Sequence, residues 1–179
     1  MLLVLKKKFI GLVVVSSSKY AATNIDLLKG FCNRMRMGGV FITANRPYNT
    51  LANDLKSRHI DIENLFFIDT VTKGVAAVPD RAEKCLYINS PRNLTEISIA
   101  LEQIIVEIPT KEKFLYLDSV STLLSYNDQD TVIKFVHFLV TKMREIWKMY
   151  GILIVLEKET DERIISQLAQ FCDKVVEVK

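Results

Sequence analysis

Short runs of apolar residues alternate along the chain with longer segments in which apolar residues recur every three or four positions. The runs predict strands, and the periodic segments predict helices. Strands are expected near residues 11–15, 39–44, 65–69, 85–89, 113–118, 151–156 and 174–178. Helices are expected near residues 24–36, 47–58, 93–108, 129–149 and 160–171. Because strands and helices alternate, we expect a largely parallel sheet with helices on both faces, which is a three-layer α/β fold.

Glycine and proline mark the expected ends of several elements. Gly38 and Gly39 are expected to stop the first helix, and Pro47 suits the first turn of the second. Residues 70–84 combine a glycine, a proline and mixed charge, so this stretch is predicted to be a surface loop.

The third and fourth helices carry start signals, and the fourth also has a broad apolar surface. Asn93 and Glu96 resemble a capping box, and Asp128 or Asp130 can cap the fourth helix. The apolar residues of that helix extend beyond one stripe, which indicates deep packing on the sheet, with a subunit contact as the alternative. His137 lies among these residues and is expected to be partly buried.

Composition narrows the class of protein. The chain has 179 residues, of which 49% are hydrophobic, enough to fill the core of one compact domain over residues 1–179. Its formal charge of +3 is far from a nucleic-acid-binding composition, despite the cluster Lys6–Lys8. The opening run Met1–Leu5 is too short for a signal-peptide core, so we predict a cytoplasmic protein without a membrane span.

Cysteine and histidine content argues against two kinds of site. Cys32, Cys85 and Cys172 are odd in number and far apart in sequence, which disfavours a disulfide framework or a zinc motif and predicts reduced, buried thiols. The chain has only two histidines, His59 and His137, which disfavours a histidine-based metal site or a catalytic triad. We therefore expect no metal site of this kind.

Two segments are similar in pattern to the halves of a nucleotide triphosphatase site. Residues 114–118, Phe-Leu-Tyr-Leu-Asp, form an apolar run that ends in an acid, as in a strand that presents a carboxylate to Mg²⁺. The expected partner is a glycine-rich phosphate loop after an early strand. Residues 16–23 occupy that place with Ser-Ser-Ser-Lys-Tyr-Ala-Ala-Thr, which fits the spacing G-x-x-x-x-G-K-[ST] only at Thr23.

The altered loop lacks the residues that hold phosphate. Ser16 and Ala21 replace two glycines, whose backbone conformations let successive N–H groups point at one anion. Ala22 replaces the lysine that meets the β and γ phosphates, so a charge-assisted contact of roughly 1.5–3 kcal/mol is missing from its usual place. The sequence therefore predicts that phosphate binding has been lost or altered.

The polar residues near the strand ends each have two interpretations. Lys19, displaced from the usual lysine position, is either a phosphate ligand or a solvated loop residue, and the bulky Tyr20 argues against a close wrap around an anion. Thr23 is either a Mg²⁺ ligand or the start of the first helix. Asp69 and Asp118 each close a strand, where they could share a cation or cap the turns that follow.

Residues 39–47, 60–69 and 114–124 together carry a resemblance to the RecA superfamily, nearest to the KaiC-like P-loop ATPases of prokaryotes. The third stretch is similar to the Walker B strand of those proteins, with its Asp-Ser-hydrophobic-Ser continuation. The ending 171–178 extends the resemblance over most of the chain. The resemblance implies a RecA-like fold with a nucleotide site at the altered loop.

The sequence departs from the ATPases that it resembles. Their catalytic glutamate follows the second core strand, where this chain has Asn45 and Arg46, and an amide cannot take a proton from the attacking water. The family also supplies basic residues from a C-terminal hairpin to a neighbouring subunit, whereas this sequence reaches Lys179 directly after its last predicted strand. The loop lysine, the catalytic glutamate and the basic C-terminal hairpin are all missing from their expected positions, which favours loss of ATP hydrolysis.

We therefore predict a catalytically inactive RecA/KaiC-like pseudo-ATPase that acts as a regulatory or protein-interaction module and needs no cofactor. The alternative is a nucleotide-binding protein or weak ATPase that uses Lys19, Thr23 and Asp118 with ATP and Mg²⁺. A third hypothesis, a nucleic-acid-binding module, rests on superfamily analogy and on Lys6–Lys8, and composition argues against it. The protein partner is not identified by the sequence, and a monomer or homodimer is expected rather than a hexamer.

Overall fold

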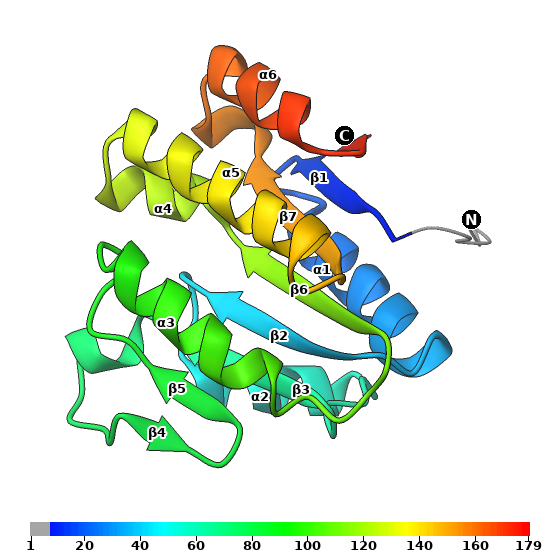
Figure 1. Cartoon of the computed structure of the whole chain (residues 1–179), viewed down its shortest axis with the longest axis vertical. Coiled ribbons are helices and arrows are strands. Elements are labelled where there is room, and N and C mark those ends of the chain that lie inside the picture. Colours follow the sequence, from blue (N-terminus) through cyan, green and yellow to red (C-terminus); the bar gives the residue numbers. More distant parts are fainter. Residues whose placement is uncertain (1–7) are drawn as a thin grey trace.

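A central eight-stranded sheet organises the computed structural model, which describes residues 8–179 (Figure 1). The strands are β1 (Ile10–Val15), β2 (Gly38–Thr43), β3 (Leu65–Asp69), β4 (Arg81–Ala82), β5 (Cys85–Tyr87), β6 (Lys113–Asp118), β7 (Tyr150–Leu156) and β8 (Lys174–Val178). Their order across the sheet is β4-β5-β3-β2-β6-β7-β1-β8. All neighbours pair in parallel except β4 and β5, which are antiparallel.

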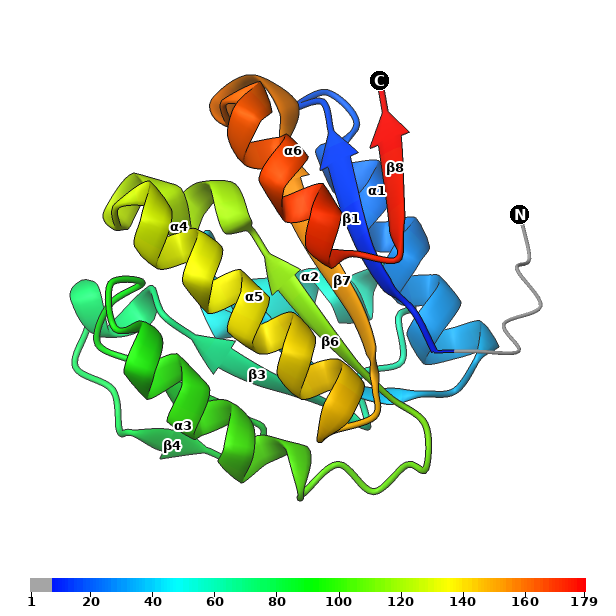
Figure 2. The ribbon, with the colours of Figure 1, turned by 45° about the horizontal axis from the view of Figure 1, so that its top comes forward.

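Helices cover both faces of the sheet, as the alternation of elements predicts (Figure 2). The helices are α1 (Tyr20–Leu28), α2 (Tyr48–Ser57), α3 (Leu94–Ile105), α4 (Val120–Tyr126), α5 (Gln129–Glu145) and α6 (Glu162–Phe171). A π-helical segment, η1 (Lys29–Arg34), continues α1, and single 3₁₀ turns lie at η2 (Thr72–Gly74) and η3 (Glu157–Glu159). The segments α1, η1 and α2 pack on one face, and α3 to α6 pack on the other.

The sheet has a hydrophobic core on each face, because side chains alternate between the two faces along each strand. In β6, Leu115 and Leu117 face α3 and α5, whereas Phe114 and Tyr116 face α1 and α2. Both sets are fully buried, which is why this strand is an almost continuous apolar run in the sequence. The run ends at Asp118, at the carboxyl edge of the sheet.

The first helix differs from its predicted bounds. It begins at Tyr20 rather than near residue 24, with Lys19 as its N-cap and no side-chain capping bond. Thr23 is therefore inside the helix, where its N–H donates to the carbonyl of Lys19, and its interpretation as the helix start is wrong. Gly38 and Gly39 do not stop this helix either, because they open β2.

Capping also differs between the third and fourth predicted helices. Asn93 precedes α3 without a side-chain capping bond, and Glu96 instead accepts hydrogen bonds from Asn89, so the predicted capping box is not formed. Asp128 does cap α5, since its carboxylate accepts from the N–H of Thr131. The sequence analysis missed α4, a helix of seven residues that follows β6 directly.

The surface of α5 corrects one further expectation. His137 is exposed rather than partly buried, and its ring stacks on Phe171 with centroids 4.5 Å apart. Residues 70–84 form the expected surface segment, in which η2 and the two-residue strand β4 are the regular elements. Within residues 8–179, no helix is long and apolar enough to cross a membrane.

The cysteines are all free, as predicted, but they differ in burial. Cys32 and Cys85 are buried, whereas Cys172 is partly exposed. Of the basic cluster near the start, only Lys8 lies in the described part, where its ammonium group contacts Glu112 at 3.1 Å. Lys6 and Lys7 lie outside the described residues, so the structure does not test this cluster as a whole.

Candidate functional site

The carboxyl edge of the sheet brings the two predicted acids to neighbouring positions. Thr43 at the end of β2 is the register partner of Asp69 on one side and of Asp118 on the other. Both carboxylates are buried, with Asp69 fully enclosed. The expectation that they lie along one edge is confirmed. The contacts of each acid show whether it caps the backbone or is available to a cation.

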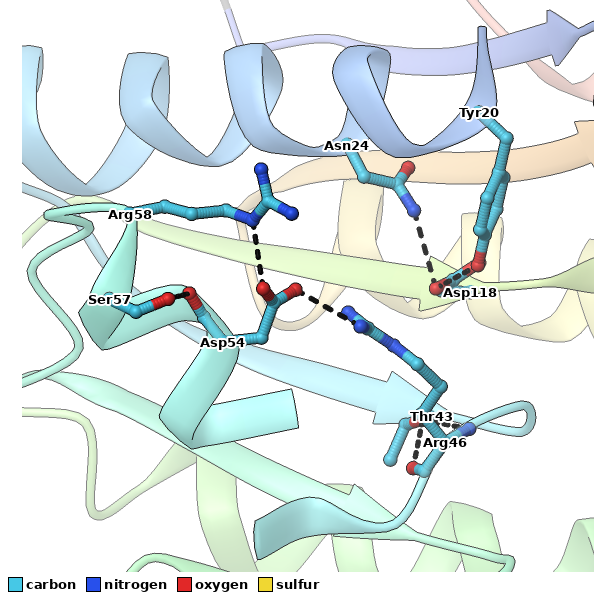
Figure 3. A network of polar contacts seen from close by, with 8 residues as sticks. All are labelled: Tyr20, Asn24, Thr43, Arg46, Asp54, Ser57, Arg58 and Asp118. Carbon is cyan, nitrogen blue, oxygen red and sulfur yellow. Dashed lines mark hydrogen bonds and ion pairs between the residues drawn. The ribbon is translucent and has the colours of Figure 1, made fainter. Parts of the chain in front are cut away.

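Asp118 is bound by two side chains from the first helix (Figure 3). The hydroxyl group of Tyr20 lies 2.5 Å from both carboxylate oxygens, and the side-chain amide of Asn24 donates to Oδ2 at 3.4 Å. Tyr20 and Asn24 are four residues apart, so they project from the same face of α1 toward β6. The carboxylate therefore has donors from α1 where a cation would otherwise bind.

Further hydrogen bonds fix these two donors. The hydroxyl of Tyr116 donates to Oδ1 of Asn24 at 2.7 Å. The amide of Asn45 donates to the Tyr20 hydroxyl at 3.4 Å, and the hydroxyl of Thr122 donates to Oδ1 of Asn45. We call the six residues joined in this way the Asp118 network; they are Tyr20, Asn24, Asn45, Tyr116, Asp118 and Thr122.

Burial controls the electrostatics of the network. It raises the pKa of Asp118 to about 6, although the hydrogen bond from Tyr20 and the charge of Arg46 act in the opposite direction. Burial, followed by the negative charge of Asp118, raises the pKa of the Tyr20 phenol well above its usual range. Tyr20 thus stays protonated and remains a hydrogen-bond donor at neutral pH.

The segment between β1 and α1 is a tight turn. The N–H groups of Lys19 and Tyr20 both donate to the carbonyl of Ser16 at 3.0 Å, and the N–H of Ser16 donates to Val178. These three amides are therefore directed at the protein's own backbone. A phosphate loop requires successive amides that point outward at one anion.

The three residues that the sequence offered as a nucleotide site, Lys19, Thr23 and Asp118, differ in their surroundings. Lys19 is exposed on the turn, and Thr23 is partly buried on α1. Among the hydrogen bonds formed within residues 8–179, the partners of the Asp118 carboxylate are Tyr20 and Asn24. The acid lies where the sequence predicts it, but its neighbours are different.

Asp69 caps the backbone that follows its strand. Its carboxylate accepts from the N–H groups of Tyr48 and Val71, each at 2.7 Å, and from both the N–H and the hydroxyl of Thr72. The capping interpretation is therefore confirmed. Within the described part of the chain, no group of three or more His, Cys, Asp or Glu side chains is arranged to hold a metal ion.

The residues at the expected position of the catalytic glutamate have other contacts. Asn45 belongs to the Asp118 network, and Arg46 turns toward α2, where it donates to Asp54 at 3.0 Å. Arg58 donates to the other oxygen of Asp54 at 2.8 Å, so two guanidinium groups share one carboxylate. Neither Asn45 nor Arg46 offers a carboxylate that could orient an attacking water.

The sequence analysis missed Tyr20, Asn24 and Tyr116 as site residues. A signal for the first two was present, because Tyr20 and Asn24 have helical spacing. This spacing is informative only if the helix begins at or before Tyr20, whereas the predicted start at residue 24 placed Tyr20 in the loop. Tyr116 looked like one more apolar position of a buried strand.

The fold is similar to that of several solved structures, among them a KaiC-like protein. An uncharacterized protein from Pyrococcus horikoshii, PH0321, in complex with an unknown peptide, has a TM-score of 0.73 at 12% identity, over 97% of this chain and 78% of that one. The KaiC-like protein PH0186 from the same species has a TM-score of 0.66 at 17% identity, over 94% and 71%. The flagellar accessory protein FlaH from Methanocaldococcus jannaschii has a TM-score of 0.60 at 14% identity, over 94% and 70%.

The sequence itself also matches a family. Residues 12–178 match the model of a family of unknown function, DUF7504, so the chain belongs to that family. A comparison with curated proteins gave no match. At identities below 20%, the similar structures establish the fold alone, and function has to be argued from the site.

Proposed function

We propose that this protein is a catalytically inactive RecA/KaiC-like domain that acts as a regulatory or protein-interaction module. The observation that carries the proposal is the contact of the Tyr20 hydroxyl with both oxygens of Asp118 at 2.5 Å. In nucleotide triphosphatases an acid at this kind of strand end holds Mg²⁺. Here Mg²⁺ would have to displace the partly buried hydrogen bond from Tyr20, whose hydroxyl also accepts from the amide of Asn45.

Two further observations support the same conclusion. The turn after β1 directs the N–H groups of Lys19 and Tyr20 at Ser16, which leaves them unable to bind phosphate without rearrangement. Asn45 and Arg46, which lie where the family resemblance implies a general base, instead contact Tyr20 of the Asp118 network and Asp54. Metal binding, phosphate binding and water activation would thus each require a different change.

The partner is proposed to be another protein. The structure of PH0321 was obtained with an unknown peptide, which is a property of that protein and makes peptide binding a reasonable function to test here. We propose that residues 1–179 act as one cytoplasmic domain, as a monomer or homodimer, since a protein that does not bind ATP has no need of a ring closed around nucleotide.

The test is calorimetry of ATP and ADP with Mg²⁺ on the purified protein, at concentrations that would detect a dissociation constant of about 1 mM. We expect no saturable heat and no phosphate release. Saturable, Mg²⁺-dependent turnover that Asp118→Asn abolishes would overturn the proposal.

A pair of lysine variants tests the competing hypothesis of a non-standard phosphate loop. If Lys19 held phosphate, Lys19→Gln would weaken nucleotide binding, whereas Lys56→Gln, which removes an exposed lysine at the far end of α2, would not. We expect the two variants to behave identically to the parent protein. A selective effect of Lys19→Gln would support the weak ATPase instead.

A further inference from the structure

A small cavity lies on the α1 and α2 face of the sheet, next to the Asp118 network. It has a volume of about 130 Å³ and lies between the two helices, with Tyr20 and Asn24 along one side. The deeper lining is apolar and fully buried; it consists of Leu28, Phe41, Leu51 and Leu55. Its polar lining from the α2 side is Arg46, Asp54 and Arg58, which are all partly exposed.

The two arginines carry more hydrogen-bonding capacity than Asp54 uses. Arg46 donates to Asp54 through one terminal nitrogen, and Arg58 donates through Nε. Within residues 8–179, the other two nitrogens of each guanidinium group form no hydrogen bond with the protein. Figure 3 shows both groups beside Asp54, in the space between the ribbons of α1 and α2.

Two guanidinium groups and one carboxylate line this mouth. The second nearby carboxylate, Asp118, accepts hydrogen bonds from Tyr20 and Asn24, so it does not occupy the free donors of the arginines. Guanidinium groups bind carboxylates through pairs of parallel hydrogen bonds, and they remain charged at any physiological pH. The combination of free guanidinium donors and a buried apolar lining suits a ligand with one anionic end and one apolar end.

We propose that this cavity binds a carboxylate carried by a compact apolar group. The apolar group enters between α1 and α2, and the carboxylate accepts hydrogen bonds from Arg46 and Arg58. An apolar protein cavity of about 150 Å³ can hold benzene, so one branched aliphatic or phenyl group is the right size here. Such a ligand is either a free acid or the C-terminal residue of a peptide, and the site does not depend on whether the protein hydrolyses ATP.

The experiment is a titration of the ¹⁵N-labelled protein, followed by two-dimensional NMR. The probes are 4-methylpentanoate for a free acid, N-acetyl-leucine for a peptide C-terminus, N-acetyl-leucinamide as its neutral analogue, and inorganic phosphate as an anion without an apolar group. We expect saturable shifts in α1, β2 and α2 with at least one of the first two probes. We expect affinity at least about tenfold lower for the amide, because it lacks the charge that the guanidinium groups recognise.

Two variants separate this site from general effects of charge. Arg58→Gln should weaken binding of the carboxylate probes by about tenfold while the protein remains folded, because Arg58 is half exposed. Arg92→Gln removes an exposed arginine at the start of α3, on the other face of the sheet, and should leave binding unchanged. Equal loss in both variants would indicate a nonspecific charge effect and overturn the proposal.

The probes also distinguish the outcomes. Binding of 4-methylpentanoate alone assigns the site to free acids, and binding of N-acetyl-leucine assigns it to peptide C-termini. Equal binding of phosphate would mean that the apolar cavity contributes nothing, and equal binding of the amide would mean that the arginines contribute nothing. Either result, or the absence of saturable shifts, would overturn the proposal.

Discussion

The hydroxyl oxygen of Tyr20 lies 2.5 Å from each carboxylate oxygen of Asp118. This contact joins the first residue of α1 to the last residue of β6, which are 98 positions apart in the chain. A buried carboxylate normally needs a counterion or several donors. Here it has a phenol and an amide, and both donors depend on further hydrogen bonds.

Removal of the Tyr20 hydroxyl should destabilise the protein in a pH-dependent way. A hydrogen bond to a charged group contributes about 1.5–3 kcal/mol, and one between neutral groups about 0.5–1.5 kcal/mol. Tyr20→Phe should therefore lower the free energy of unfolding by the larger amount at about pH 8, where Asp118 is ionised, and by the smaller amount at about pH 4.5. Urea denaturation at the two pH values measures both.

Tyr126→Phe is the matched control, because Tyr126 is exposed. We expect its effect to stay within about 0.5 kcal/mol at both pH values. If Tyr20→Phe proved equally harmless, the contact with Asp118 would not contribute to stability.

Asp118 itself should make the protein less stable as pH rises. The folded-state pKa of about 6 lies above the ordinary value of 3.8, so between these values the folded protein binds more protons than the unfolded chain. The contribution of Asp118 to the free energy of unfolding is fully present below about pH 4. It is lost as pH rises through about 6, a change of roughly 3 kcal/mol.

Asp118→Asn should remove this pH dependence while it keeps an oxygen that can accept from Tyr20. Between about pH 4 and pH 8, the free energy of unfolding of the variant should increase relative to that of the parent protein as pH rises. Asp130→Asn, at an exposed position in the first turn of α5, serves as the control. Parallel pH profiles for Asp118→Asn and the parent would contradict a raised pKa.

The fold could be predicted from the sequence because apolar runs and helical periodicity determine a parallel sheet with two covered faces. The acids at the strand ends followed from the same pattern, since a strand that ends in a carboxylate is visible in one dimension. The contacts of Asp118 were not predictable in this way. They depend on a helix start at Tyr20 that lacks a side-chain cap, and on a tyrosine in β6 that resembles any core residue.

The cap made by Asp69 should be worth more than an exposed cap. Asp69→Ala leaves the partly buried N–H groups of Tyr48, Val71 and Thr72 without their acceptor, so we expect a loss of about 3 kcal/mol in total. Asp128→Ala removes the exposed cap of α5 and should cost about 0.5–2 kcal/mol. Thermal or urea unfolding of the two variants compares them, and a smaller effect at Asp69 would mean that water replaces the lost acceptor.

Gly39 should be intolerant of any side chain, for a reason unrelated to helix termination. A Cβ at this position would lie 2.5 Å from the ring of Phe114, which packs across the strand. The ring cannot easily move away, because it also stacks on Phe31 at 4.8 Å between centroids. Gly39→Ala should therefore destabilise the protein by about 1–3 kcal/mol through overpacking.

Gly30 provides the opposite case on the same face of the sheet. No atom lies within 4 Å of a Cβ built there, and its φ is not positive, so Gly30→Ala should stabilise the protein by about 0.4–1 kcal/mol through the unfolded state.

A double variant tests the clash at Gly39. Adding Phe114→Leu to Gly39→Ala should recover part of the stability lost in Gly39→Ala, because a smaller side chain makes room for the new methyl group. If the double variant were no better than the sum of its single changes, the clash between Gly39 and Phe114 would not be the cause.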